Sequence, residues 1–232
     1  HGGTEMGQGL HTKIMGIIAE EFDLPISKIK ISATDTSKVP NTSATAASSG
    51  SDLNGMAVLN AINILKSRLA SVLCASYGAD RKSIQYKSGF VVFDDGKISF
   101  EALIKMAYEQ RIQLSASGFY KTPKIYWDRS KGQGRPFFYY SYGAAVAEVT
   151  VDEFTGESTV DRVDILHDVG KSLNNYIDLG QIEGGFIQGM GWLTNEELWW
   201  DQKGRLKTHA PSTYKIPLAS DRPRIFNVEL AN

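Results

Sequence analysis

The sequence of 232 residues contains one cysteine, Cys74, and four histidines. A single cysteine excludes an intramolecular disulfide, a cysteine-held zinc ion and an Fe–S cluster bound by this chain alone. The histidines stand at positions 1, 11, 167 and 209, a spacing that is not typical of metal ligands. We therefore expect no metal ion to be ligated directly by these side chains, and a reducing, cytoplasmic setting.

Charge of one sign is not in excess, because 25 Lys and Arg residues stand against 26 Asp and Glu residues. The electrostatic footprint of a nucleic-acid-binding protein is therefore missing. No run of about 18 uncharged apolar residues occurs, and the first residues do not resemble a signal peptide. These absences predict a chain that binds no nucleic acid and does not span a membrane.

The common catalytic motifs are missing too. There is no nucleophile elbow and no P-loop, and Gly7-Gln8-Gly9 lacks the third glycine and the preceding strand of a dinucleotide-binding fingerprint. The carboxylates between 152 and 157 and the pair Glu196-Glu197 have the pattern of solvated charges in a turn and at a helix end. The residues themselves assign no catalytic acid, base or nucleophile.

The sequence opens on a glycine-rich stretch that leads into helical periodicity over residues 10–23. Gly7 and Gly9 allow positive φ angles and a close approach of the backbone, and Gln8 carries two hydrogen-bond donors and an acceptor. N–H groups at the start of a helix favour an anionic or electron-rich ligand. An ordinary turn before an amphipathic helix would show the same pattern, so both interpretations stay open.

A second stretch, residues 34–51, consists almost entirely of small and polar residues and resembles a linker in composition. It runs into a strongly apolar helix with Ser51 or Asp52 as the expected N-cap, so we favour a binding loop at a helix start. The expected apolar face of that helix consists of Leu53, Ala57, Ala61, Ile64, Leu65, Leu69 and Val72.

The remaining patterns predict an α+β fold in which mixed sheets are flanked by helices, with no internal domain boundary. Ser99 is expected to cap a third helix. The other expected elements are a strand over 29–32, a hairpin over 83–98 with its turn at 94–97, an extended segment over 114–126, a mobile polar loop over 128–136, paired strands over 139–152 and 158–166, a hairpin over 199–206 and a strand over 225–230.

Residues 176–198 predict a helix with five glycines, each of which costs about 1 kcal/mol relative to alanine. Gly180 and Gly184 are four residues apart, so they share a face that a backbone or a flat ligand can approach closely. Gln181 and Gln188 are the polar groups that could contact such a ligand. Packing of this face in the core is the alternative.

Six segments, in order along the chain, resemble the molybdenum-binding part of the xanthine dehydrogenase family, which includes aldehyde oxidases and carbon monoxide dehydrogenases. The stretches around Phe119 and Tyr214 are most similar to xanthine dehydrogenase itself. The segments are Gly2–Lys13, Val39–Ser48, Asp52–Gly55, Ser117–Pro123, Asp178–Gly184 and Pro211–Pro217.

This resemblance implies a molybdenum cofactor of the pterin-dithiolene type, molybdopterin, whose sulfurs hold the metal. In the family, the glutamine that matches Gln8 contacts the oxo group and the cofactor, and the one that matches Gln181 contacts the pterin. Ala46 and Ala47 match small residues beside the metal, where a bulkier side chain would block the substrate. The implied cofactor-binding residues are Met6, Gly7, Gln8, Thr45, Ala47, Ser48, Ser49, Gly50 and Gln181.

The resemblance also implies the reaction, which is hydroxylation of a purine with oxygen from water, electrons passing to FAD and [2Fe-2S] clusters on other domains or subunits. The general-base glutamate is expected beyond Asn232, and the residues that orient the purine before His1. The chain is therefore interpreted as a C-terminal part of the molybdopterin-binding domain, cut at both ends and inactive alone. Expected partners are the remainder of that domain, the FAD and Fe–S parts and further copies of the same chain.

Two alternatives stay open at this stage. The substrate can be an aldehyde or carbon monoxide instead of a purine, or the isolated piece can be a non-catalytic scaffold. The chain departs from close relatives at Ser48-Ser49-Gly50-Ser51, where those relatives have alternating small residues. Because hydrogen-bond donors are kept there, contact with the cofactor is still expected.

Overall fold

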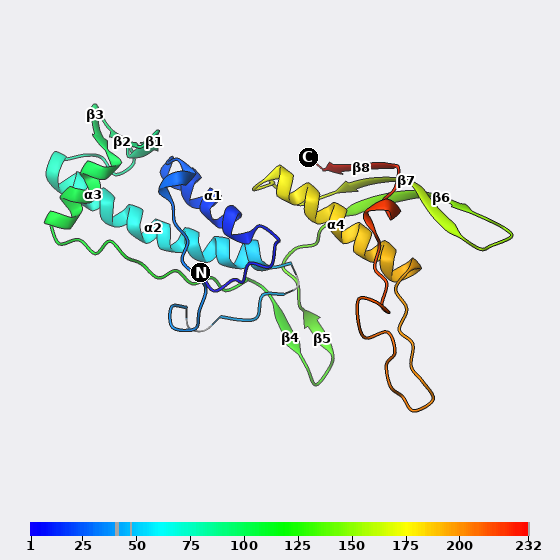
Figure 1. The fold of residues 1–232 in the computed structure, drawn as a ribbon. Coiled ribbons are helices and arrows are strands. Elements are labelled where there is room, and N and C mark those ends of the chain that lie inside the picture. The colour runs from blue at the N-terminus through cyan, green and yellow to red at the C-terminus, as the bar shows by residue number, and fades with distance from the viewer. Residues whose placement is uncertain (40–41, 47, 232) are drawn as a thin grey trace. The chain divides into compact units, whose positions relative to one another are not determined.

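The computed structural model describes residues 1–39, 42–46 and 48–231 (Figure 1). The chain forms two compact units, residues 1–138 and residues 139–232. The sequence gives no sign of this division because an aromatic run over residues 137–142 crosses it without any change in composition. Each unit is described by itself below.

The first unit combines three helices with a small antiparallel sheet and a separate hairpin (Figure 1). The sheet has the order β1-β2-β3, and β4 pairs with β5. The elements are α1 (Leu10–Phe22), a 3₁₀ turn (Ile26–Lys28), α2 (Gly50–Tyr77), β1 (Gln85–Lys87), β2 (Phe90–Phe93), β3 (Gly96–Ser99), α3 (Phe100–Glu109), β4 (Tyr126–Asp128) and β5 (Gln133–Arg135).

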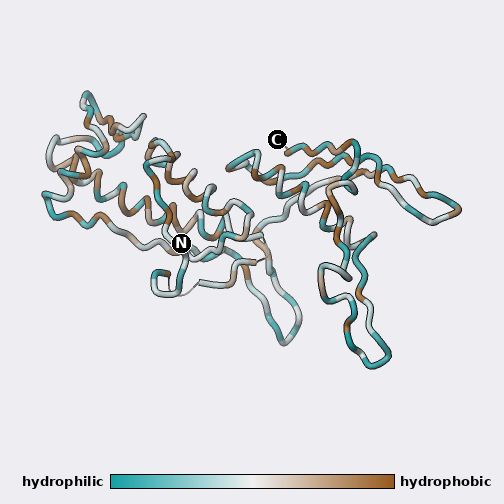
Figure 2. The backbone as a smooth tube through the Cα atoms, in the orientation of Figure 1, coloured by the Kyte–Doolittle hydropathy of each residue, from teal (hydrophilic) through white to brown (hydrophobic). Residues whose placement is uncertain are grey.

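The core of the first unit lies where α2, α3 and β2 meet, and Figure 2 shows apolar residues gathered there. Ser99 caps α3 as expected, because its hydroxyl oxygen accepts a hydrogen bond of 3.1 Å from the backbone N–H of Ala102. The buried residues of this core are Phe22, Ile62, Leu69, Val72, Leu73, Ala79, Val91, Phe93, Leu103 and Ala107.

Helices α1 and α2 run side by side in the same direction. A Cβ atom built at Gly50 would lie 3.5 Å from Leu10 at the start of α1. At the other end of α1, the ammonium group of Lys66 lies 2.6 Å from the carboxylate of Glu21. The two helix starts therefore lie at the same end of the unit, so the positive ends of both helix dipoles point toward the same region.

An extended segment, residues 112–122, lies along α2. Arg68 donates hydrogen bonds to the carbonyl oxygens of Gln113 and Ser115 at 3.0 and 2.7 Å. Further along, the amide of Asn60 donates to the carbonyl oxygen of Phe119 at 2.7 Å. The segment thus lies close to α2 over about two of its turns.

The second unit has a three-stranded sheet of order β6-β7-β8, in which β6 and β7 are antiparallel and β7 and β8 are parallel. Helix α4 packs on β8, where the rings of Phe186 and Phe226 lie 5.4 Å apart. A single bridge joins Trp200 and Leu206 at the expected hairpin. The elements are β6 (Gly143–Val151), β7 (Ser158–His167), α4 (Asn175–Thr194), a 3₁₀ turn (Ala219–Asp221) and β8 (Ile225–Leu230).

Two predictions of local structure were wrong. Residues 29–32 alternate like a strand but pair with no strand of the described residues, so they have no ladder of hydrogen bonds. Residues 128–136, expected as a loop, contribute to the β4–β5 hairpin instead. The carboxylate of Asp128 accepts from the backbone N–H groups of Ser130 and Lys131 at 2.9 and 3.3 Å and closes that turn.

Helix α2 also differs from its prediction in two respects. It begins at Gly50 with Ser49 as the N-cap, before the expected Ser51 or Asp52. Its buried stripe includes Leu69 but not Ile64, which is 40% exposed. The burial along α2 depends on contacts with α1, α3 and the extended segment, which come from different parts of the sequence.

By length and mean hydropathy alone, α2 is the one helix of the described residues that could cross a membrane. Its apolar residues contribute to the core of the first unit, and Lys66 and Arg68 make polar contacts along it. A core helix of this length has the same composition. The absence of a membrane span therefore stays a prediction from the sequence.

Candidate functional site

The glycine-rich loop before α1 is held together by the carboxylate of Glu5. Its Oε1 atom accepts hydrogen bonds from the backbone N–H groups of Gly7 and Gly9 at 3.0 and 2.9 Å. Its Oε2 atom accepts from the N–H of His11 at 2.8 Å. Gly7 and Gly9 have φ angles of 100° and 78°, which glycine adopts without strain. The loop is therefore an ordered structure with a conformation of its own.

Burial raises the pKa of Glu5, but the hydrogen bonds from His11, Gly9 and Gly7 outweigh that effect, so the pKa is lowered overall. Glu5 is consequently a carboxylate at neutral pH. The N–H groups that the sequence suggested for an external anion already have an anionic partner inside the chain.

Gln8 lies between the two glycines, and its side chain folds back on the loop. Its Oε1 atom accepts from the N–H of Met6 at 2.6 Å, and its Nε2 atom donates to the carbonyl oxygen of Thr4 at 2.8 Å. Each of these atoms has one further hydrogen-bonding site, for which the described residues supply no partner. Gln8 is thus fixed in place with one donor and one acceptor left over.

The second predicted segment lies against this loop. The N–H of Thr4 donates to the hydroxyl oxygen of Thr45 at 2.8 Å. The N–H of Gly3 donates to the side-chain oxygen of Asn54 at 3.1 Å, and the Asn54 amide in turn donates to the carbonyl oxygen of Gly50 at 2.8 Å. Two segments that are about 40 residues apart in the sequence therefore form one site at the starts of α1 and α2.

Within the second segment, Ser48 has a φ angle of 54°, and Ser49 is the N-cap of α2. The hydroxyl of Ser49 donates to the carbonyl oxygen of Ala46 at 3.1 Å and makes no capping hydrogen bond. Ala46 and Ser48 are exposed. Ala47, predicted both for the substrate pocket and for the cofactor, lies outside the described residues.

Gln181 lies on α4, in the second unit, and its side chain is exposed. Within that unit, a Cβ atom at Gly180, Gly184 or Gly189 would have no atom within 4 Å. The glycines of α4 therefore do not pack in the core of their own unit, with the exception of Gly191, which meets Pro217. The remaining glycine face is open, as an approaching backbone or flat ligand requires.

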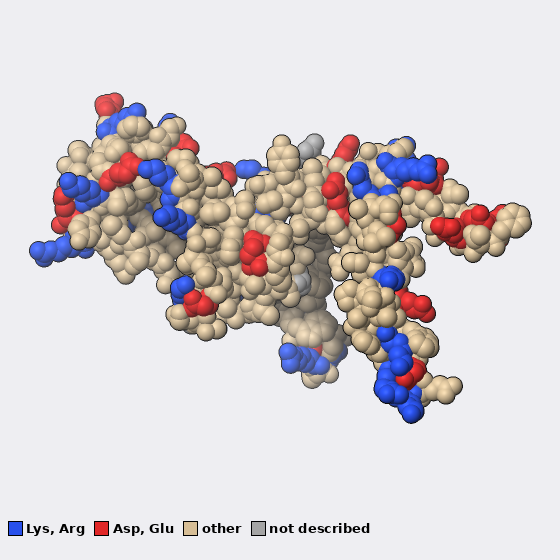
Figure 3. All heavy atoms as spheres, viewed as in Figure 1, with Lys and Arg blue, Asp and Glu red and all other residues tan. Residues whose placement is uncertain are grey.

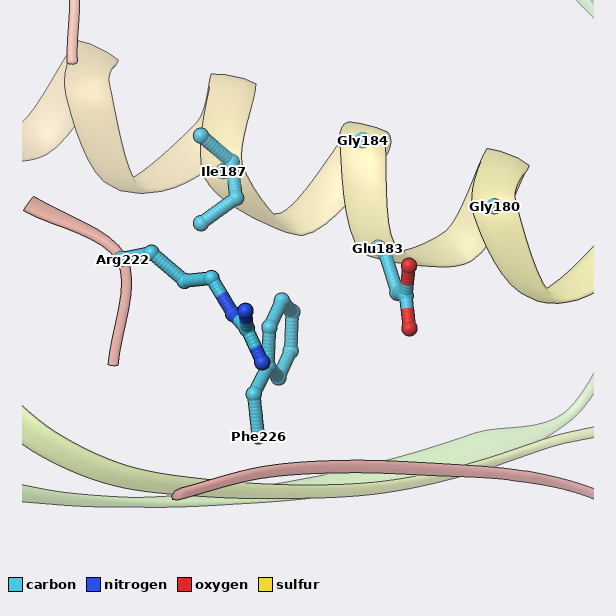
Figure 4. A pocket seen from close by; sticks show the side chains of 6 residues that line it. All are labelled: Gly180, Glu183, Gly184, Ile187, Arg222 and Phe226. Carbon is cyan, nitrogen blue, oxygen red and sulfur yellow. The ribbon is translucent and has the colours of Figure 1, made fainter. Parts of the chain in front are cut away.

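A cavity of about 540 Å³ lies beside α4, between Glu183, Arg222 and Phe226 (Figure 4). The ring of Phe226 and the guanidinium of Arg222 lie next to each other below the helix (Figure 4). A second, more apolar cavity of about 570 Å³ is lined by Tyr214 and its neighbours. Neither cavity includes Gln181 among its lining residues.

The segment around Tyr214, one of the six on which the resemblance rests, is fastened to the end of α4. The Tyr214 hydroxyl donates a hydrogen bond to the carboxylate of Glu196, and this bond raises the pKa of Tyr214. The pair Glu196-Glu197 was interpreted as solvated charge from the sequence. Glu196 has a definite partner instead, and its role is to hold this segment.

Charged side chains do not assemble into a metal centre in the described part of the chain. No three His, Cys, Asp or Glu side chains among those residues could hold a metal ion together. On the face seen in Figure 3, basic and acidic side chains of the first unit are interspersed. The site at the starts of α1 and α2 is therefore built from backbone groups, amides and hydroxyls.

Sequence reasoning missed two residues of this site, Glu5 and Asn54. A glutamate two residues before a Gly-x-Gly turn that leads into a helix was a usable signal, because carboxylates stabilise helix N-termini. Asn54 gave no such signal, because a polar residue in the first turns of a helix is ordinary.

Comparisons with known proteins give a consistent result. Residues 1–223 match the family described as the molybdopterin cofactor-binding domain. The chain is 47% identical to a xanthine dehydrogenase of Oryza sativa subsp. japonica, of which it covers 16% while 99% of this chain is aligned. It is 46% identical, with the same coverage of both chains, to aldehyde oxidase 2 of Macaca fascicularis.

Solved structures show the same fold. Quinoline 2-oxidoreductase from Pseudomonas putida 86 matches with a TM-score of 0.82 at 23% identity, over 99% of this chain and 29% of its own. The Cu,Mo-CO dehydrogenase matches with a TM-score of 0.82 at 19% identity, over 99% and 28%. The predicted α+β fold, with mixed sheets flanked by helices, is confirmed.

Proposed function

Since this chain belongs to the molybdopterin cofactor-binding domain family, we propose that it forms the cofactor-binding portion of a xanthine dehydrogenase-like hydroxylase that oxidises purines such as hypoxanthine and xanthine. The observation that carries this proposal is the junction of the Gln8 loop with the Thr45 segment at the starts of two parallel helices. The similarity to xanthine dehydrogenases over 99% of the chain supports the choice of reaction.

The residues at this junction fit a polar, electron-rich cofactor. Gln8 offers one donor and one acceptor beyond its contacts within the loop, which suits the mixed edge of a pterin. At Gly7, open space surrounds the position that a Cβ atom would occupy. The N–H groups in the first turn of α2, together with Thr45, Ser48 and Ser49, suit a phosphate.

We assign the holding of the cofactor to Met6, Gly7 and Gln8 on one side and to the segment from Thr45 to Gly50 on the other. For Gln181 we propose a contact with the pterin because the glutamine that matches it in the family makes one. When bound, the cofactor supplies the molybdenum centre at which the substrate carbon is hydroxylated with oxygen derived from water. This chain's own contribution is to bind and orient that group. The small side chain of Ala46 leaves room for the substrate.

The chain spans about one sixth of the length of the curated relatives that it matches. We propose that the whole protein supplies further catalytic residues, including the general-base glutamate that the resemblance implies, and that this chain is inactive alone. The partners proposed are the remainder of the molybdenum domain, the parts that carry FAD and the [2Fe-2S] clusters, and a second copy of the enzyme in the cytoplasm.

Replacing Gln8 and Gln181 with alanine tests the proposed contacts with the cofactor. In the complete enzyme that contains this chain, each change removes an amide that would hydrogen-bond to the pterin, a loss of about 1 kcal/mol or more per bond. The double variant should retain less than about half of the wild-type molybdenum and pterin. Gln202→Ala, at an exposed glutamine outside the proposed site, is the control and should leave both contents unchanged. Normal molybdenum content and turnover in the double variant would refute the assignment.

An aldehyde-oxidising enzyme is the second candidate, because the identity to aldehyde oxidase 2 of Macaca fascicularis, 46%, is nearly that to the xanthine dehydrogenase of Oryza sativa subsp. japonica, 47%. Values of kcat/KM for xanthine and for an aromatic aldehyde separate the two candidates. Xanthine should be preferred by at least about tenfold, which corresponds to about 1.4 kcal/mol in the transition state. A preference for the aldehyde would support the second candidate, an aldehyde-oxidising enzyme.

A further inference from the structure

Glu5 has no assigned role in the cofactor site, yet its carboxylate accepts three backbone hydrogen bonds, whereas the side chain of Gln8 makes two. One of its oxygens accepts from Gly7 and Gly9, the backbone neighbours of Gln8, at 3.0 and 2.9 Å. The other accepts from His11 in the first turn of α1 at 2.8 Å. The conformation of the chain on both sides of Gln8 therefore depends on a single carboxylate.

The Gln8 side chain depends on the same arrangement. Its two hydrogen bonds go to the backbone of Thr4 and Met6, the residues on either side of Glu5. If the carboxylate released Gly7 and Gly9, the positive φ angles at these glycines would no longer be enforced, and the loop would gain conformational freedom. Gln8 would then lose its fixed direction.

Glu5 also takes up a backbone donor at the start of α1. The starts of α1 and α2 lie together, since a Cβ atom at Gly50 would contact Leu10 at 3.5 Å. At α1, the first-turn N–H of His11 is taken by the Glu5 carboxylate. At α2, the hydroxyl of the N-cap Ser49 bonds to Ala46 and does not cap the helix. Each helix start carries a carboxylate in or beside its first turn, Glu5 at α1 and Asp52 at α2, so charge alone does not direct an anion to either start.

We propose that Glu5 is the positioning residue of the cofactor loop: it fixes the backbone that presents Gln8 to the cofactor. The inference about the cofactor rests on the proposed function of the chain. Its structural half, the dependence of the loop on Glu5, stands on the hydrogen bonds alone.

The test uses Glu5→Ala and Glu5→Gln in the complete enzyme, with Glu109→Ala as the control. Glu109 is an exposed carboxylate of the same unit with only a long ion pair to Lys105 at 3.9 Å. Two quantities are measured in each protein, the hydrogen exchange of the amides of Gly7, Gly9 and His11, and the molybdenum and pterin content.

In Glu5→Ala, exchange at these amides should be at least about tenfold faster, because hydrogen bonds to a charged acceptor contribute about 1.5–3 kcal/mol. Exchange in the centre of α2 should stay the same, and cofactor content should fall. Glu5→Gln should lie between wild type and Glu5→Ala, because an amide oxygen accepts the same hydrogen bonds more weakly. The control should match the wild type in both measurements.

Unchanged exchange in Glu5→Ala would overturn the inference, and so would faster exchange with full cofactor content. Failure of the proposed function has a different signature, a wild-type enzyme without molybdenum or pterin. In that case the exchange measurement still decides the structural half: faster exchange confined to these amides supports it, and unchanged exchange overturns it.

Discussion

Replacing Gly118 with alanine is expected to destabilise the contact between the extended segment and α2 by about 3 kcal/mol or more, because a well-packed backbone cannot accommodate an added methyl group without moving. The new Cβ atom would overlap the carbonyl oxygen of Ala57 and lie 2.7 Å from the backbone nitrogen of Ala61. Both neighbours are main-chain atoms of a helix, so neither can rotate away.

Native-state hydrogen exchange of the α2 amides measures this effect, since a loss of 3 kcal/mol accelerates exchange through local opening by on the order of 100-fold. The matched control is Gly16→Ala in α1, where an added Cβ atom has no atom within 4 Å. Gly16→Ala should slow exchange of the α1 amides, because alanine favours a helix over glycine by about 1 kcal/mol. Equal exchange of the α2 amides in Gly118→Ala and Gly16→Ala would show that the extended segment does not lie against α2.

Leu73→Ala is expected to destabilise the first unit by about 2–5 kcal/mol, the range for large-to-small changes in a packed core. The Leu73 side chain has no exposed area and contacts the cluster that α2 forms with α3 and β2. Truncation leaves a cavity that these rigid neighbours can fill only in part. The loss is measured by hydrogen exchange at Val72 and Leu103, or by resistance to proteolysis within the unit.

Ile64→Ala, on the same helix, is the control for that experiment. The sequence pattern placed Ile64 on the buried face and left Leu73 out, whereas the structure gives Ile64 an exposed fraction of 40%. Its truncation should cost well under half as much, because much of the side chain is already in water. A larger effect for Ile64 than for Leu73 would mean that the rotation of α2 is wrong.

Ile64 and Leu73 show which features helical periodicity alone can predict and which it cannot. The three helices of the first unit and α4 were predicted, because each carries apolar residues at helical spacing over more than two turns. The buried side of α2 was only partly predicted, since it depends on three neighbours that come from distant parts of the sequence. The prediction of a strand over residues 29–32 was wrong for the same reason. These residues alternate like a strand, but no strand among the described residues pairs with them.

The candidate site shows the same division. The glycine loop and the segment from Thr45 were identified as separate signals, and the resemblance placed both at one cofactor. What joins them is a set of hydrogen bonds between backbone N–H groups and the side chains of Thr45 and Asn54. No one-dimensional pattern encodes such contacts, because either side chain could equally well have faced solvent. The internal anion, Glu5, was overlooked although its place before a glycine turn and a helix start was a usable signal.

The most direct test of the account is the number of molybdenum atoms and pterins per chain in the purified complete enzyme, determined by metal analysis and by pterin fluorescence after oxidation. We expect one molybdenum and one pterin for each copy of this chain, both falling together to less than about half when Gln8 and Gln181 are replaced with alanine. A fully folded, wild-type enzyme that contains neither would contradict the assignment of this chain as a molybdenum cofactor-binding domain.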